Sequence, residues 1–113
     1  MSNTRDDDLG AALDALYATL VDRKTADPTK SYAASLYAKG LDAILKKIGE
    51  ESAETLIAAK NGNRPELVHE MVDVLYHLFV LMAREGIHPG DLAVELKRRA
   101  GRSGLEEKAV RVK

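Results

Sequence analysis

The sequence contains no cysteine, which excludes disulfide bonds, thiolate zinc sites and cysteine nucleophiles. A metal ion would therefore have to be held by oxygen or imidazole ligands. The sequence also has little net charge, since 17 basic residues are balanced by 18 acidic ones. This balance argues against a protein whose whole surface is built to bind nucleic acid.

Long apolar runs are also missing. The longest one, VLYHLFVLMA at residues 74–83, has about half the length that a bilayer-spanning helix needs. The first ten residues, MSNTRDDDLG, have no apolar stretch behind a basic start, so they do not resemble a secretory signal. We therefore expect a cytoplasmic protein that does not associate with membranes.

The composition is that of one globular domain, with 45% hydrophobic and 31% charged residues in 113 positions. The charge is distributed unevenly, because residues 97–113 hold seven basic and two acidic side chains and the rest of the chain is acidic. We expect a single domain over residues 1–113 that ends in a basic C-terminal tail from about residue 101. The sequence does not predict whether this tail is ordered.

Apolar residues recur at steps of three and four near the N-terminus, a spacing typical of a helix with one apolar face. They are Leu9, Ala12, Leu13, Leu16, Tyr17 and Leu20. We predict a helix over about residues 6–23. The KTADPTK segment interrupts the pattern, because Pro28 disfavours helical geometry at the residue before it. Residues 31–60 are compatible with helix, and a break is preferred near Gly40 because glycine costs about 1 kcal/mol in a helix relative to alanine.

A second set of signals divides the rest of the chain. The Asn61–Gly62 pair predicts a helix end, and Pro65 predicts the start of the next helix. That helix should end at Gly86, and a short final helix should begin near Pro89 and end by Gly101. The sequence shows no alternating strand pattern and no internal repeat. We therefore predict an all-α protein, a small bundle of four to five helices.

Five carboxylates stand out in the two central predicted helices. A connection as short as NGNR forces these helices to lie side by side and antiparallel. Glu51 and Glu54 are three residues apart and share one helix face, and so do Glu70 and Asp73. Glu54 and Glu70 both lie seven residues from the turn. The two pairs should therefore converge, with Glu50 at their edge.

The simplest interpretation of such a cluster is a solvated helix face. Glu70 and Asp73 do not fit it well, because they interrupt an apolar run and an unpartnered buried carboxylate is costly. Two unit charges 4 Å apart repel by about 4 kcal/mol even at an effective dielectric constant of 20. Lys47 and Lys60 are too few to neutralise five carboxylates. A hard divalent cation would neutralise them, and oxygen ligands favour Mg²⁺, with Mn²⁺ as a substitute.

Two nearby residues leave alternatives open. His77 lies one turn after the second carboxylate pair, where it could act as a base or contact a phosphate, or could simply pack in the bundle with a hydrogen-bonded neighbour. Lys47 could bind phosphate, or could only form an i,i+4 ion pair with Glu51. His69 and His88 are predicted to be a surface residue and a turn residue.

The spacing of the carboxylates resembles a known signature. EESAE, followed after fifteen residues by EMVD, is similar to the EExxE…ExxD motif of the MazG-like superfamily of all-α nucleoside triphosphate pyrophosphatases. The segments SYAASLYAKG, KIGEESAETLIAAKNG and ELVHEMVDVLYHLFVLMAREGI resemble the phosphoribosyl-ATP pyrophosphatases of histidine biosynthesis. The segment GRSGLEEKAVR resembles the C-terminal tail of some bacterial members. The resemblance covers about residues 9–111.

The resemblance implies an activity and roles for particular residues. It implies Mg²⁺-dependent hydrolysis of the α–β phosphoanhydride of phosphoribosyl-ATP to phosphoribosyl-AMP and pyrophosphate, the second step of histidine biosynthesis. The implied metal ligands are Glu51, Glu54, Glu70 and Asp73. Glu50 would bind a second ion or position water, and His77 is a further candidate catalytic residue. The candidate phosphate-binding residues are Lys39, Lys47 and Lys60.

Other functions remain open at this point. A housecleaning pyrophosphatase acting on dCTP, dUTP or damaged nucleotides would use the same carboxylates. A helical assembly module would carry them only as surface charge, and a di-iron bundle would need Glu-x-x-His pairs where this sequence has Glu54 and Asp73. Because residues 74–83 are apolar on all sides of their predicted helix, we expect a homodimer that buries this segment. A phosphoribosyl-AMP cyclohydrolase is the expected functional partner.

Overall fold

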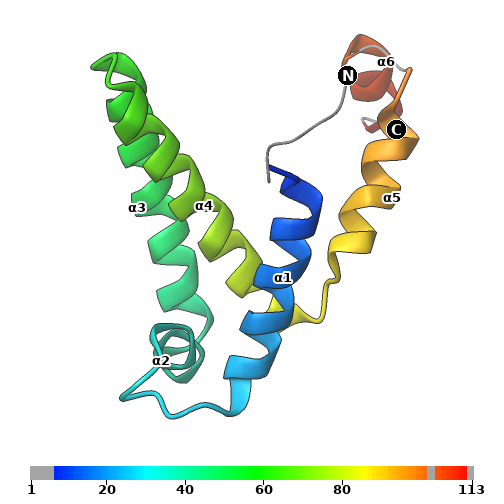
Figure 1. Cartoon of the computed structure of the whole chain (residues 1–113). Coiled ribbons are helices and arrows are strands. Elements are labelled where there is room, and N and C mark those ends of the chain that lie inside the picture. The colour runs from blue at the N-terminus through cyan, green and yellow to red at the C-terminus, as the bar shows by residue number, and fades with distance from the viewer. Residues whose placement is uncertain (1–6, 102–103, 112–113) are drawn as a thin grey trace.

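The computed structural model describes residues 7–101 and 104–111, and over these residues it contains helices and no strand. The helices are α1 (Leu9–Asp22), α2 (Tyr32–Lys39), α3 (Leu41–Lys60), α4 (Arg64–Glu85), α5 (Pro89–Arg99) and α6 (Gly104–Arg111), with a 3-10 turn, η1 (Arg23–Thr25), after α1. They form the small all-α bundle that the sequence predicts (Figure 1).

Helix α1 begins later than the predicted start at residue 6, which itself lies outside the described residues. Asp8 is extended and its carboxylate accepts a hydrogen bond of 3.1 Å from the backbone N–H of Ala11. Asp8 therefore caps the helix, as short polar side chains commonly do. The prediction placed this aspartate inside the first turn, but it lies in front of it.

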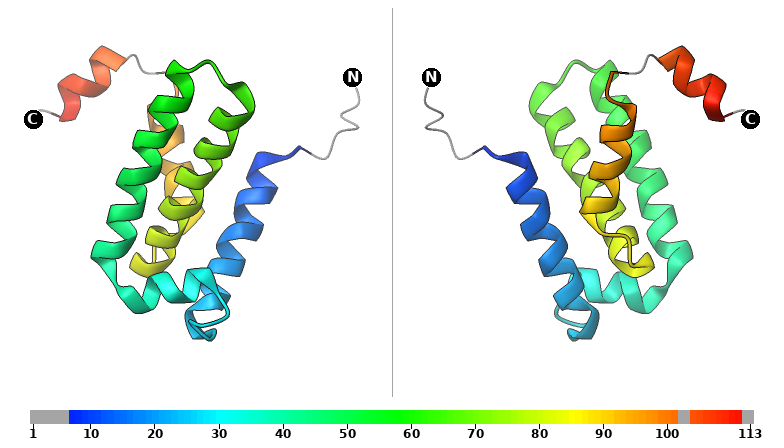
Figure 2. Two further views of the ribbon diagram at one scale, coloured as in Figure 1. Left: turned by 90° about the vertical axis from the view of Figure 1, so that its left-hand side faces the viewer. Right: turned by 90° about the vertical axis from the view of Figure 1, so that its right-hand side faces the viewer.

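Helices α2 and α3 are separated at Gly40, as predicted. Ser31 caps α2 by accepting a 3.1 Å hydrogen bond from the N–H of Ala34. Gly40 has φ 99° and ψ −179°, a backbone conformation that is readily available only to glycine. The chain turns there, so that α2 runs across the base of α3 and α4 (Figures 1 and 2).

Helices α3 and α4 form an antiparallel hairpin, which confirms the arrangement expected from their short connection (Figure 2). Gly62 occupies the left-handed region with φ 68°. The side chain of Asn63 then caps α4 by accepting a 3.1 Å hydrogen bond from the N–H of Glu66. This turn fixes the register in which the carboxylate-bearing faces of the two helices meet.

The core lies where α1, α2 and the first part of α3 meet the second half of α4. Its buried side chains are Leu20, Ala33, Leu36, Ile44, Phe79, Val80, Met82 and Ala83. The hydroxyl of Tyr37 on α2 donates a 2.8 Å hydrogen bond to the carbonyl of Leu20 at the end of α1. This bond connects the two helices that cover α4.

The segment 74–83 is partly covered within the single chain. Phe79, Val80, Met82 and Ala83 are buried within the single chain, because α1 and α2 pack onto them. Leu78 stays exposed, and Val74, Leu75, Tyr76 and Leu81 are half-buried, so a part of the segment is left uncovered and the homodimer stays a prediction. Large exposed apolar side chains lie nearer the α3–α4 turn, and they include Leu56, Ile57, Val68, Met71 and Val72.

The C-terminal region begins with α5, whose start at Pro89 agrees with the prediction. His88 caps this helix and forms a reciprocal capping box with Asp91, so its predicted place in a turn is confirmed. The tail contains α6, which the sequence did not predict; residues 102–103 and 112–113 lie outside the described residues. None of the helices in the described ranges has the length and apolarity needed to cross a membrane.

Candidate active site

The facing sides of α3 and α4 bring three of the predicted metal ligands together. Carboxylate oxygens of Glu51, Glu54 and Glu70 all lie within 4.8 Å of one another. Glu51 and Glu70 are buried, with 7% and 5% of their surfaces exposed, whereas Glu54 is exposed. The register set by the turn thus places carboxylates from opposite helices at the same height.

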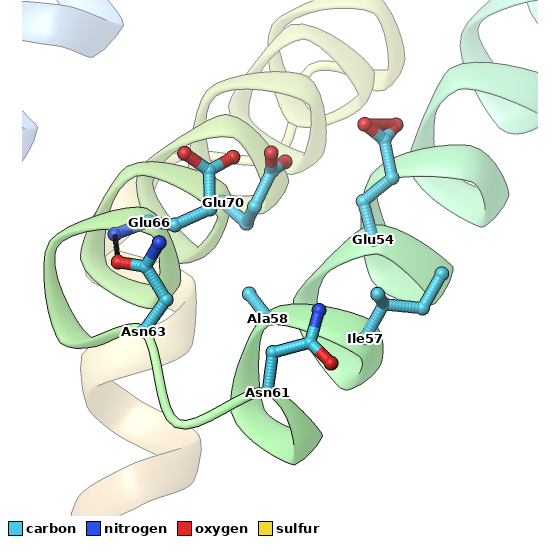
Figure 3. Close-up of a pocket in the computed structure, with 7 residues that line it drawn as sticks. All are labelled: Glu54, Ile57, Ala58, Asn61, Asn63, Glu66 and Glu70. Carbon is cyan, nitrogen blue, oxygen red and sulfur yellow. Dashed lines mark hydrogen bonds between the residues drawn. The ribbon is translucent and has the colours of Figure 1, made fainter.

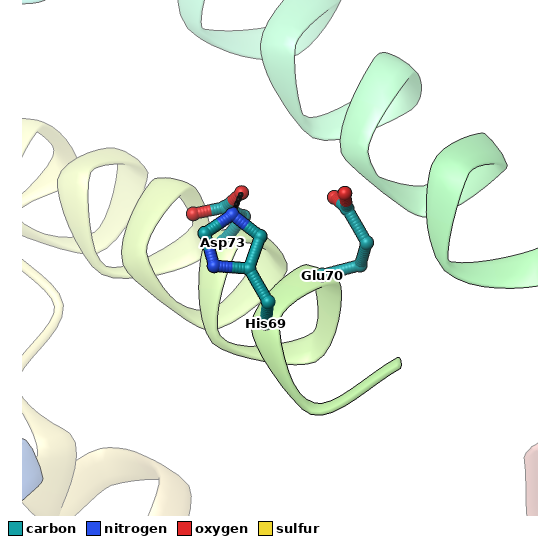
Figure 4. A group of neighbouring side chains, drawn as sticks. All are labelled: His69, Glu70 and Asp73. Carbon is teal, nitrogen blue, oxygen red and sulfur yellow. Dashed lines mark ion pairs between the residues drawn. The ribbon is translucent and has the colours of Figure 1, made fainter. Parts of the chain in front are cut away.

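The fourth predicted ligand, Asp73, belongs to a second group that overlaps the first. Ligand atoms of His69, Glu70 and Asp73 lie within 4.8 Å of one another. Nε2 of His69 is 3.3 Å from Oδ2 of Asp73, while Glu70 projects toward α3 (Figure 4). His69 is largely exposed, as predicted for a surface residue. Glu70 is therefore the residue shared by the two groups.

Glu70 has the least satisfied carboxylate of the described residues. Its Oε1 is buried and has no hydrogen-bond partner among them. The neighbouring carboxyl group of Glu66, burial and the carboxyl group of Glu51 raise the pKa of Glu70 to about 7. A buried oxygen without a donor is costly, and a bound cation would relieve this cost. The all-oxygen donor set of Glu51, Glu54 and Glu70 fits a hard divalent ion such as Mg²⁺.

A hollow of ≈ 220 Å³ opens beside this carboxylate group on the side of the α3–α4 turn. It is lined by Glu54, Ile57, Ala58, Asn61, Asn63, Glu66 and Glu70. Glu66 and Glu70 lie next to each other on α4, with Glu54 opposite them on α3 (Figure 3). Carboxylates thus extend from the predicted ligands toward the turn.

Lys47 contacts the carboxylate group from the side that faces away from the α3–α4 turn. Its Nζ lies 3.3 Å from Oε2 of Glu51 and 3.7 Å from Oε1 of Glu50. Burial lowers the pKa of Lys47, but the hydrogen bond to Glu51 and the negative charges nearby outweigh this effect and raise it overall. The i,i+4 ion pair is therefore present, and a contact with phosphate stays a prediction.

A second hollow, of ≈ 320 Å³, lies at the α2 end of the carboxylate group. It is lined by Tyr32, Leu36, Lys39, Ala43, Lys46, Lys47 and Glu50. Lys39 thus shares a hollow with Lys47 and Glu50, as its predicted phosphate role would require. Lys60 is the last residue of α3 and lies at the opposite end of that helix from this hollow.

His77 is buried and both of its ring nitrogens have partners. Nδ1 lies 2.7 Å from the carbonyl oxygen of Asp73, and Nε2 lies 2.7 Å from the hydroxyl of Tyr32. A carbonyl can only accept, so Nδ1 carries the proton and Nε2 accepts from Tyr32. These are the bonds expected of the packing alternative, and a catalytic role for His77 stays a prediction.

Comparison with known proteins identifies the family. The family described as phosphoribosyl-ATP pyrophosphohydrolase matches residues 13–100. The chain belongs to this family. Among its relatives, the phosphoribosyl-ATP pyrophosphatase of Methylococcus capsulatus is 62% identical over 92 residues, 81% of this chain and 88% of that protein. The phosphoribosyl-ATP pyrophosphatase of Geobacter sulfurreducens is 50% identical over 109 residues, 96% and 97% of the two chains.

The part of the chain that matches the phosphoribosyl-ATP pyrophosphohydrolase family contains both hollows and all five predicted carboxylates. The resemblance to the phosphoribosyl-ATP pyrophosphatases, drawn from the SYAASLYAKG and KIGEESAETLIAAKNG segments, is confirmed by this match. The roles of individual residues in binding a metal ion or substrate are separate from family membership, and they stay predictions.

Three residues that line the site were missed by the sequence reasoning. Glu66 lies four residues before Glu70, so the same helical spacing that paired the other carboxylates could have found it. Lys46 adjoins Lys47, but it was not singled out. Tyr32 gave no usable signal, because its contact with His77 joins residues 45 positions apart.

Proposed function

We propose that this protein hydrolyses 1-(5-phosphoribosyl)-ATP between its α- and β-phosphates, releasing phosphoribosyl-AMP and pyrophosphate in the second step of histidine biosynthesis. Membership of the phosphoribosyl-ATP pyrophosphohydrolase family and relatives named phosphoribosyl-ATP pyrophosphatase over nearly their full lengths support this assignment. The structural observation that carries it is the convergence of Glu51, Glu54 and Glu70, where Oε1 of Glu70 is buried without a hydrogen-bond partner among residues 7–101 and 104–111.

We propose Mg²⁺ as the cofactor, with Mn²⁺ as a substitute. Glu51, Glu54 and Glu70 would hold the ion, and Asp73 would contribute from the overlapping group. When bound, such an ion supplies charge neutralisation for the triphosphate oxygens and lowers the pKa of water. Its binding would also remove the repulsion that the three carboxylates exert on one another.

The other residues of the site have roles that follow from their positions. Water adds to phosphorus while the bridging oxygen departs with the pyrophosphate, so the attacking water must be held in line and must lose a proton. Glu50 lies at the edge of the carboxylate group, where its carboxylate would orient this water. Lys47 contacts Glu50 and Glu51 and would keep both side chains directed into the site while facing the substrate phosphates.

A pyrophosphate-release assay tests the proposed function. Phosphoribosyl-ATP should be cleaved in the presence of Mg²⁺, and cleavage should stop on addition of EDTA. ATP, dCTP and dUTP serve as comparison substrates, because a housecleaning pyrophosphatase would use the same carboxylates on them. A preference for dCTP or dUTP over phosphoribosyl-ATP would reject the assignment.

We also propose that the protein acts as a homodimer. The radius of gyration is 16.6 Å, whereas a compact chain of this length has about 13 Å. Apolar side chains on α3 and α4 are left exposed, among them Leu56, Val68 and Met71, and exposed apolar patches commonly mark contacts between proteins. Light scattering should give the mass of two chains, and Met71→Glu should shift the mass toward that of one chain.

Two further proposals concern the cellular setting. The product phosphoribosyl-AMP would be passed to a phosphoribosyl-AMP cyclohydrolase, so addition of that enzyme to the assay should convert the product further. We propose a cytoplasmic location, which fractionation of cells expressing the tagged protein would test.

A further inference from the structure

The hollow at the α2 end of the site has a charge opposite to that of the hollow at the turn. Lys39, Lys46 and Lys47 line the first, whereas Glu54, Glu66 and Glu70 line the second. The carboxylate group lies between them. A ligand that spans the site would therefore meet carboxylates at one end and ammonium groups at the other.

Two of the three lysines are available for a ligand. Lys47 is engaged by Glu50 and Glu51. Lys39 and Lys46 are exposed, and within residues 7–101 and 104–111 neither has an acidic partner within ion-pair distance. Two ammonium groups without partners in one hollow form a local surplus of positive charge in a chain whose net charge is −1.

One wall of this hollow is held by a part-buried hydrogen bond. Tyr32 lines the hollow, and its hydroxyl donates to Nε2 of the buried His77. His77 is itself oriented by the carbonyl oxygen of Asp73. The tyrosine ring is therefore held in position relative to α4.

We propose that this hollow binds a phosphate monoester, the 5-phosphate of the ribose that is attached to the adenine ring of the substrate, with Lys39 and Lys46 contacting its oxygens and Tyr32 forming its wall. This inference rests on the proposed function. It assigns to these residues the recognition of the group that distinguishes phosphoribosyl-ATP from ATP.

The charges at the two ends of the substrate indicate which end binds in which hollow. The triphosphate would be neutralised by the ion that the carboxylates hold. The separate phosphate monoester carries nearly two negative charges at neutral pH and is attached on the other side of the adenine ring from the triphosphate. Lysine binds phosphate as a compact point charge, so the lysine-lined hollow supplies the missing countercharge.

The test uses Lys39→Gln, Lys46→Gln and the double variant, with Lys24→Gln as the matched control. Lys24 is an exposed lysine of η1 outside both hollows, so its replacement removes one charge elsewhere on the surface. The Michaelis constant for phosphoribosyl-ATP and the inhibition constant of ribose 5-phosphate are measured for each, with ribose as the uncharged comparison. Melting temperatures establish that each variant is folded.

The proposal expects ribose 5-phosphate to inhibit the wild type competitively and ribose to inhibit far more weakly. The double variant should raise both the KM and the inhibition constant at least tenfold, with kcat within about twofold of the wild type, and Lys24→Gln should change neither constant. Equal inhibition by ribose and ribose 5-phosphate, or lysine variants with unchanged constants, would overturn it. A fall in kcat at unchanged KM would also overturn it, since the lysines would then act at the reacting phosphates.

Failure of the proposed function would be seen separately, as a wild type that releases no pyrophosphate from phosphoribosyl-ATP. Calorimetric titration with ribose 5-phosphate still decides the role of the hollow in that case. Binding to the wild type that is lost in the double variant would support a phosphate monoester site. Equal binding to both, or binding to neither, would reject it.

Discussion

The hydroxyl of Tyr32 lies 2.7 Å from Nε2 of His77, which connects α2 to the helix that carries Glu70 and Asp73. The bond uses the ring nitrogen that a general base at this position would need. Nδ1 donates to the carbonyl of Asp73, so both ring nitrogens are engaged and the orientation of the imidazole is fixed. The same two residues therefore link the wall of the lysine-lined hollow to the carboxylate group.

Replacement of Tyr32 by phenylalanine tests this link. The substitution leaves the buried Nε2 of His77 without its donor, which should lower the free energy of unfolding by about 1–3 kcal/mol. Urea denaturation measures this change. If the pair positions Tyr32 at the hollow, Tyr32→Phe should raise KM for phosphoribosyl-ATP more than it lowers kcat.

His77→Gln separates positioning from base catalysis. As a positioning residue, His77 can be replaced with a rise in KM, and the dependence of kcat on pH should keep the shape that it has in the wild type. A base would behave differently: turnover would fall at least tenfold, about 1.4 kcal/mol in the activation barrier, and the acidic limb of the pH profile would disappear. The full profile of kcat against pH, measured for both proteins, distinguishes the two results.

The raised pKa of Glu70 makes the stability of the metal-free protein depend on pH. Its pKa is about 7 in the folded chain, against an ordinary value of 4.5, so between these values the folded state binds more protons than the unfolded state. Stability in EDTA should therefore fall as pH rises from about 4.5 through 7. Glu70→Gln should flatten this dependence, and Mg²⁺ should reverse it in the wild type. Denaturation midpoints at a series of pH values provide the measurement.

Glu54→Gln should move stability and activity in opposite directions. The amide removes a negative charge with little change in volume, so stability in EDTA should stay level or rise. The same change should weaken stabilisation by Mg²⁺, which for a bound ligand is about 2.7 kcal/mol at a hundredfold excess over its dissociation constant. Pyrophosphate release should fall by orders of magnitude. A variant that is less stable in EDTA but still active would mean that Glu54 is a structural ion-pair partner.

Replacement of Gly40 by alanine tests the junction between α2 and α3, and the same change at Gly49, inside α3, is its control. A methyl group at either position would meet no atom within 4 Å, so any difference in stability comes from the backbone. Gly40→Ala should destabilise the protein by about 1–2 kcal/mol, because φ is 99° there. Gly49→Ala, in the interior of α3, should stabilise it by about 0.5–1 kcal/mol. Equal effects in thermal melts would contradict the role given to Gly40.

Much of the fold could be predicted because its determinants are local. The breaks at Gly40 and Gly86 and the turn at Gly62 coincide with glycines that adopt positive φ, and the start of α5 follows from Pro89. The pairing of α3 with α4 follows from a connection too short for any other arrangement. The carboxylate spacing then required only helical periodicity to bring Glu54 near Glu70.

The remaining features depend on contacts between distant parts of the chain. The burial of Phe79 and Val80 requires α1 and α2 to pack over them, which no periodicity within 74–83 reveals. The division of the predicted ligands into two overlapping groups arises because Asp73 turns toward His69. Helix α6 was not predicted because its eight residues include only three apolar side chains besides a glycine, Leu105, Ala109 and Val110, which are too few to establish a helical period from sequence.

The contrast between the two hollows has a consequence for which bond is cut. If the ribose phosphate of the substrate binds at Lys39 and Lys46 as proposed, the substrate would cross the site in one direction only, with its triphosphate at the carboxylates. The distance between the bound ribose phosphate and the triphosphate would then determine which phosphoanhydride bond reaches the carboxylate group. Loss of the anchor would allow the triphosphate to slide by one phosphate, and orthophosphate would begin to appear beside pyrophosphate among the products.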